Sequence, residues 1–305
     1  MNYLELYQAI QDYSENTESL FVQNIPRFVM EAEDRIYNSV QIPALRKNVT
    51  GAATANIPYL SIPADYLSTY SIAVVDSTGS YNYLLNKDVN FIRAAYPKAT
   101  TTGLPIYYAT FGPQYSDLNS LSFILGPTPD SNYTVEMHYF YYPVSIVQGV
   151  ISTVSITNAG SSYTNGTYEN VALTGGSGTG ALATITVAGG VITTVSIING
   201  GSLYVANDIL TASAASIGNT GSNFSITVTT VNNAAGTSWL GNNYDPVLLY
   251  GAMREAMLFM MGEQDLVAYY EQKYQEALGQ LKRLGDGLER GDAYRDGQTK
   301  LKVTS

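Results

Sequence analysis

Residues 244–288 read YDPVLLYGAMREAMLFMMGEQDLVAYYEQKYQEALGQLKRLGDGL, and this stretch decides the helical part of the fold. Asp245-Pro246 is typical of a helix start, because Asp caps the first turn and Pro at the first helical position loses only an N–H that has no partner there. Apolar residues then recur at helical spacing, with an interruption at Gly262. The sequence therefore predicts two helices, the second of which begins at Gln264-Asp265.

Both helices carry narrow apolar stripes. These stripes suit packing along a neighbouring helix, in the same chain or in another subunit. Their positions are Leu249, Met253, Ala256 and Met260 in the first helix and Leu266, Tyr270, Tyr274, Ala277, Leu281, Leu284 and Leu288 in the second.

The first 146 residues have two kinds of periodicity. Helical spacing predicts helices over 3–13 and 25–40, and Val49 to Ala55 is interpreted as a loop. From Ile57 the period changes to two, which predicts a series of short strands up to Tyr142, with a short helix over 88–96. We expect an α+β fold, in which the N-terminal and C-terminal helices form a helical bundle with a small antiparallel β-sheet.

A tandem repeat follows, with a constant offset of 41 residues. Residues 149–163 and 190–204 are identical at 11 of 15 positions, and the segment 149–231 contains only two charged residues, Glu169 and Asp208. One unit has too little apolar surface to fold alone, so we expect repeat 1 (149–189) and repeat 2 (190–231) to pair into one all-β domain, with a hairpin at Gly189-Gly190. The predicted organisation is a core of 1–146 and 237–288, an inserted domain over 149–235 and an arm over 289–305.

Composition excludes several classes of site. Cysteine is absent and His138 is the single histidine, which removes thiol nucleophiles, Cys-zinc sites and histidine-rich metal sites. No signal peptide or run of about 18 apolar residues is present, so a cytoplasmically made protein without a membrane span is expected. The net charge of −10 argues against non-specific binding to nucleic acid, although an acidic wall would let DNA slide past it.

No group of residues predicts an active site, a cofactor or a metal. Glu31, Glu33 and Asp34 are interpreted as a solvated helix face, because Glu31 lies four residues from both Arg27 and Arg35. Glu136 and His138 share one face of a strand, but no nucleophile accompanies them. The glycine-rich runs lack the Lys-Ser/Thr ending of a phosphate loop and are expected to be turns.

Several motifs resemble the adaptor (connector) proteins that join head to tail in tailed phages. The residues that carry the resemblance are Ile25-Pro26-Arg27-Phe28, Ile62-Pro63-Ala64-Asp65-Tyr66, Gly103-Leu104-Pro105-Ile106, Leu125-Gly126-Pro127-Thr128-Pro129 and Trp239-Leu240 followed by Tyr244-Asp245-Pro246. The resemblance covers about 1–146 and 237–290, in order and with similar spacing. The repeat is a departure from the family pattern.

The resemblance implies a structural virion protein of the neck or tail, assembled in the host cytoplasm. It implies a ring, usually a dodecamer, that binds the portal, lines a DNA channel without specific DNA binding, and docks the tail nozzle and fibres. Packing between subunits would then use Leu249, Met253, Met260, Leu266, Tyr270, Tyr274 and Leu281. The portal-binding arm would use Leu288, Arg290, Tyr294, Arg295, Lys300, Leu301 and Lys302.

Two other functions remain open on the sequence. The first is a glycan- or fibre-binding module of a phage tail, in which the repeat domain recognises the ligand. The second is a wall-degrading enzyme, which lacks a supporting set of acid and base residues.

Overall fold

The computed structural model describes residues 1–98, 100–114 and 117–296. It divides into two compact units. The first comprises Met1–Val40 and Val144–Gly287, and the second contains Gln41–Pro143. The first holds most of the helices together with the repeat, and the second is built mainly of strands.

The helices of the first compact unit are α1 (Tyr3–Ser14), α2 (Ser19–Ser39), α4 (Trp239–Asn243), α5 (Asp245–Phe259) and α6 (Gln264–Asp296). α5 packs against α2 and α1. Gly251 makes this packing possible, since a Cβ there would lie 3.0 Å from the Cβ of Ala32 and 3.4 Å from the ring of Tyr274. The predicted start of the last helix at Gln264 is confirmed.

α2 differs from the expected helix over 25–40, because it begins at Ser19 and contains Pro26 in its interior. Pro26 lacks the N–H that would donate to the preceding turn, yet it is buried on the same face as Ile25 and Val29. Burial of this face outweighs the lost hydrogen bond, so the helix runs through the proline.

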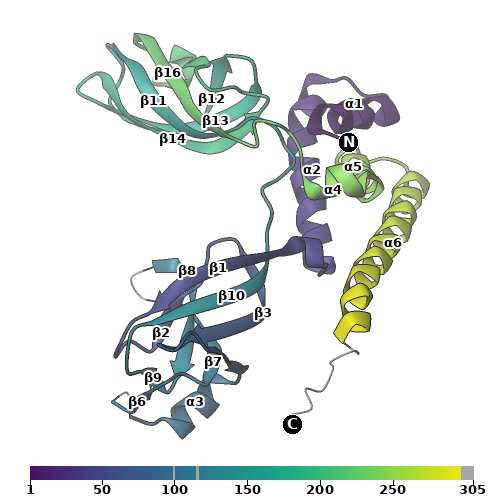
Figure 1. Ribbon diagram of the computed structural model, residues 1–305. Coiled ribbons are helices and arrows are strands. Elements are labelled where there is room, and N and C mark those ends of the chain that lie inside the picture. Colours follow the sequence, from purple (N-terminus) through teal and green to yellow (C-terminus); the bar gives the residue numbers. More distant parts are fainter. Residues whose placement is uncertain (99, 115–116, 297–305) are drawn as a thin grey trace, which may run out of the picture. The chain divides into compact units, whose positions relative to one another are not determined.

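The repeat forms one six-stranded antiparallel sheet. Its strands are β11 (Val150–Ser161), β12 (Gly166–Gly175), β13 (Thr179–Ala188), β14 (Val191–Ser202), β15 (Ile209–Ala212) and β16 (Ser222–Asn232), with a short 3₁₀ turn at Ala214–Ser216. Their order is β11-β16-β15-β12-β13-β14, and the outer strands β11 and β14 lie side by side, so that the sheet is almost a closed barrel (Figure 1). The expected pairing of the two repeats and the hairpin at Gly189-Gly190 are confirmed.

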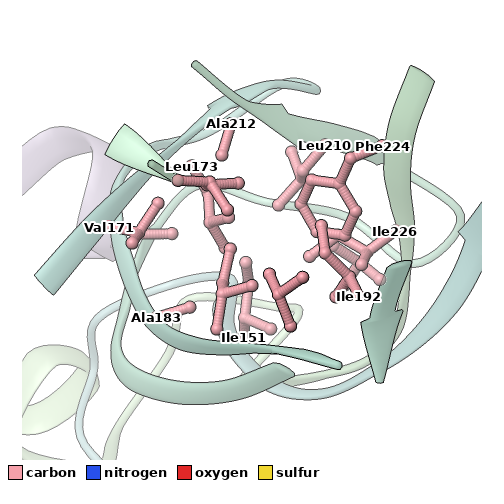
Figure 2. Close-up of a cluster of buried hydrophobic side chains, with 14 of the residues drawn as sticks. Ile151, Val171, Leu173, Ala183, Ile192, Leu210, Ala212, Phe224 and Ile226 are labelled. Carbon is pink, nitrogen blue, oxygen red and sulfur yellow. The ribbon is translucent and has the colours of Figure 1, made fainter. Parts of the chain in front are cut away.

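Side chains from both repeats fill the interior of this barrel (Figure 2). Gly200 of β14 lies so close to β11 that a Cβ there would be 2.6 Å from the backbone oxygen of Ile151. A glycine is therefore required where the two outer strands meet.

The second compact unit contains two four-stranded sheets that share one core. One has the order β1-β10-β3-β4 and the other β2-β8-β7-β5. The strands are β1 (Arg46–Ala53), β2 (Tyr59–Ser61), β3 (Tyr66–Val75), β4 (Tyr81–Tyr83), β5 (Leu85–Asn86), β7 (Tyr107–Gln114), β8 (Asp117–Gly126) and β10 (Tyr133–Tyr141). The remaining elements are β6 (Thr102–Gly103) paired with β9 (Thr128–Pro129), a 3₁₀ turn at Pro43–Leu45, and α3 (Val89–Ala95), which packs on β7.

The expected fold class is wrong. In the part of the chain that the structure describes, strands hold 39% and helices 33%, and the helices are scattered rather than gathered in a bundle core. Two features account for the difference. The strands of the repeat are long, and β1 forms where a loop over 49–55 was expected. β1 has no alternating apolar pattern, because it is an edge strand held through backbone pairing with β10.

Candidate functional site

The apolar stripe of α6 is covered by its own chain only in its middle. Tyr270, Tyr274, Ala277 and Leu281 are buried. By contrast, Leu266 is 46% exposed, and Leu284 and Leu288 at the other end are 42% and 47% exposed. The stripe therefore offers unfilled apolar surface at both ends.

Four charged residues hold the middle of α6 on the other helices. Arg254 of α5 contacts Glu271 of α6 at 2.7 Å, and Arg35 of α2 contacts the same carboxylate at 3.4 Å. Both arginines also contact Glu255, at 2.7 and 3.1 Å. Burial would raise the pKa of Glu271, but a hydrogen bond from Gln275 and the charges of Arg254 and Arg35 lower it below its usual value. The carboxylate thus remains ionised within the network.

The seven residues predicted to pack between subunits occupy different environments. Met253, Tyr270, Tyr274 and Leu281 are buried within their own chain, Leu249 and Met260 are half-buried, and Leu266 is exposed. The structure adds Met261, at the turn between α5 and α6, to this surface. Its side chain is 93% exposed and its φ is 52°, a left-handed conformation that is uncommon for methionine.

The residues predicted to form the portal-binding arm are only partly described. Leu288 is exposed, and the backbone of Arg290, Tyr294 and Arg295 continues α6. Lys300, Leu301 and Lys302 lie outside the described residues.

The repeat sheet joins the helices through two chain segments that are hydrogen-bonded to each other. The side chain of Asn233 donates to the carbonyl of Ser145 at 2.8 Å, and Gln148 donates to the carbonyl of Ala234 at 2.8 Å. The backbone N–H of Gly149 donates to the carbonyl of Asn232 at 3.2 Å. Residues 232–236 are therefore tied to the incoming segment.

Glu33 anchors this junction to α2. Its Oε1 accepts the backbone N–H of Ile146 at 2.9 Å, and its Oε2 is buried with no hydrogen-bond partner among the described residues. Burial raises the pKa of Glu33 to about 7, against the hydrogen bonds from Ser145 and Ile146, which lower it. The expectation that Glu33 lies on a solvated face is wrong, since only 2% of it is exposed. The neighbouring ion pair of Glu31 with Arg27, at 2.7 Å, is confirmed.

The other polar groups singled out in the sequence have structural roles. His138 contacts Glu136 at 3.1 Å on β10. Asp208 accepts hydrogen bonds from the N–H and hydroxyl of Ser177 and the N–H of Val205, which fix the glycine-rich turn. Within the described residues no group of three or more His, Asp or Glu could hold a metal ion, and no helix there is long and apolar enough to cross a membrane.

Comparison with known families identifies the chain. The family model described as SU10 adaptor protein matches residues 1–172, which is more than half of the 305 residues. The match includes α1, α2, residues 41–143, β11 and most of β12, whereas the C-terminal helices lie beyond it. No curated protein matches the chain. The chain belongs to the SU10 adaptor protein family, and it is therefore a structural head-to-tail adaptor of the phage virion neck.

Proposed function

We propose that this adaptor forms a ring between the portal and the tail, with twelve subunits, and that DNA passes through the ring. The observation that carries the proposal is the family membership, because adaptor proteins connect portal and tail components. The exposed ends of the α6 stripe support it, since large apolar side chains gathered on one helix are typical of a surface that another chain covers.

The proposed contact between subunits uses the exposed part of the stripe. Leu266, Leu284 and Leu288 are available to a second copy, and Met261 adds an adaptable apolar side chain shortly before Leu266 in sequence. Met253, Tyr274 and Leu281 support the contact indirectly, because they fix α6 on its own chain. Tyr270 belongs to the same stripe, and Leu249 and Met260 belong to the stripe of α5.

DNA would pass through the ring without specific binding. The chain carries a net charge of −10, and an acidic channel wall repels the phosphate backbone, so that DNA does not adhere during packaging or ejection. The arm over 289–305 contains four of the fifteen basic residues, and we assign it to the portal.

The segment 149–235 would act as an inserted domain that faces the tail nozzle or fibres. Its two ends meet, since Gly149 is hydrogen-bonded to Asn232 and Gln148 to Ala234, and an inserted domain requires neighbouring ends. Its low charge and abundant hydroxyl groups suit a protein contact.

Native mass spectrometry of the chain mixed with its portal tests the ring, and Leu284→Asp tests the contact. We expect Leu284→Asp to abolish ring closure while the isolated chain stays folded, because the charge enters an exposed apolar contact. Ile209→Asp is the matched control, since Ile209 is also an exposed apolar residue (61%) but lies in the repeat sheet. Equal ring formation by both variants would count against the proposed contact.

A further inference from the structure

The strand order of the repeat sheet is symmetric with respect to the two repeats. β11, β12 and β13 of repeat 1 correspond to β14, β15 and β16 of repeat 2. Exchanging each strand for its counterpart turns the order β11-β16-β15-β12-β13-β14 into its own reverse. The two repeats are therefore related by an approximate twofold axis.

The hydrogen-bond registers follow the same symmetry. The pairing of β11 with β16 skips residues 152 and 157, and the pairing of β14 with β13 skips 193 and 198, which are the same positions 41 residues later. Opposite these strands, Ala159 pairs with Phe224 and Gly200 with Ala181, so along residues 154–161 of β11 and 195–202 of β14 the partner strands β16 and β13 correspond at an offset of 43. The difference of two from the sequence offset keeps the same residues facing inward.

Contacts between the repeats are reciprocal as well. Gly221 of repeat 2 lies against the ring of Tyr163 of repeat 1, and Gly178 of repeat 1 lies against the ring of Tyr204 of repeat 2. A Cβ on either glycine would approach the ring within about 2.5 Å. Each repeat thus contributes a tyrosine ring that packs on a glycine of the other repeat, which is the pattern of an isologous dimer interface.

Neither repeat completes a sheet by itself. β11 pairs with β16 of the other repeat, and β14 pairs with β13. Without its partner repeat, each would expose long unpaired strand edges and half of the interior shown in Figure 2.

The sizes of the interior side chains make the repeats complementary. Ala181 and Ala183 of repeat 1 correspond by register to Phe224 and Ile226 of repeat 2. At the central pair of β12 and β15 the sizes are reversed, because Leu173 of repeat 1 pairs with Ala212 of repeat 2. A pair of first repeats would leave space unfilled at Ala181 and Ala183 and would crowd two Leu173 side chains at the centre, and a pair of second repeats would do the reverse.

We infer that the 41-residue repeat is a self-associating interaction module whose partner is the complementary repeat, supplied either by the same chain or by a second copy of this chain. The junction permits this exchange. Exchange between chains requires the turn at Gly189-Gly190, which joins the repeats, to open, and the contact of Gly149 with Asn232 would then form between two chains. The chain can thereby link to another copy through a surface independent of the α6 stripe.

Two deletion variants of the full chain test the inference. Variant A lacks residues 190–231 and keeps repeat 1, and variant B lacks 149–189 and keeps repeat 2. We expect untagged B to co-purify with tagged A as a 1:1 complex, with a gain of β-structure over the separate variants in circular dichroism. A chain that lacks residues 149–231 is the control, and it should not bind A.

Point variants separate repeat pairing from other contacts. Phe224→Ala in variant B is expected to weaken the complex by at least about a hundredfold, since loss of a buried phenylalanine leaves a cavity. Ile209→Ala, at an exposed position of the same repeat, should leave the affinity unchanged. The inference is overturned when A and B do not associate on co-expression, when the control binds A equally, or when Phe224→Ala has no effect.

Discussion

Replacement of Glu33 by Gln should change how the stability of the helical part depends on pH. Glu33 is buried at the junction and accepts the N–H of Ile146, and Gln keeps an acceptor oxygen at that place while removing the ionisable proton. The variant therefore separates the charge of Glu33 from its hydrogen bond.

The direction in which stability changes with pH follows from the raised pKa of Glu33. Burial raises the pKa of Glu33 from 4.5 to about 7. Below pH 4.5 the folded and unfolded chains are both protonated at this residue, so it contributes no pH dependence there. Between 4.5 and 7 the unfolded chain loses the proton and the folded chain keeps it, so the wild type loses stability as pH rises, and above 7 the loss is complete. At 1.36 kcal/mol per pKa unit, the total is about 3 kcal/mol.

The assay is urea unfolding followed by the fluorescence of Trp239, the single tryptophan, which lies on α4. We expect Glu33→Gln to match the wild type at pH 4.5 and to be more stable by up to about 3 kcal/mol at pH 8. Glu31→Gln is the control, because Glu31 is exposed and should leave the wild-type slope intact. Parallel pH profiles of the wild type and Glu33→Gln would show that the pKa of Glu33 is not raised in the folded chain.

Three further predictions concern packing. Gly200→Val should destabilise the repeat sheet by about 2 kcal/mol or more, because the new Cβ would clash with the backbone of Ile151. Val191→Ala, at an exposed position of the same strand, is the control and should cost little. Thermal unfolding followed by circular dichroism compares the two variants. Gly251→Val should loosen α5 from α2 and α6, and faster amide exchange over α6 is the expected readout; unchanged exchange would contradict the packing. Arg254→Met should likewise release α6, by about 1–3 kcal/mol, because Glu271 loses its closer partner; a variant as stable as the wild type would show that the network adds nothing.

The helical elements could be predicted largely from periodicity. The start at Gln264 and the short helix near 89–95 both follow from spacing and turn residues. The prediction of a helical bundle is wrong because sequence periodicity indicates where helices form but not which layer forms the core. β1 shows the same limit, since an edge strand is selected by its partner β10 rather than by its own pattern.

The candidate site, too, could be predicted from the sequence only in part. The apolar stripe of α6 is visible in the sequence, but the division into covered and exposed parts depends on Gly251 and on the four-residue charge network that includes Glu271. Glu33 carries no sequence signal that separates it from Glu31, two residues before it. The chain from Ser145 to Val147 passes over α2 and buries Glu33, whereas Glu31 stays in solvent.

The most direct test of the adaptor role is electron microscopy of the purified chain mixed with its portal. We predict a closed ring seated on the portal, with the exposed ends of the α6 stripe covered by neighbouring subunits. Portal particles that carry no ring, or a ring in which Leu266, Leu284 and Leu288 all face solvent, would contradict the account.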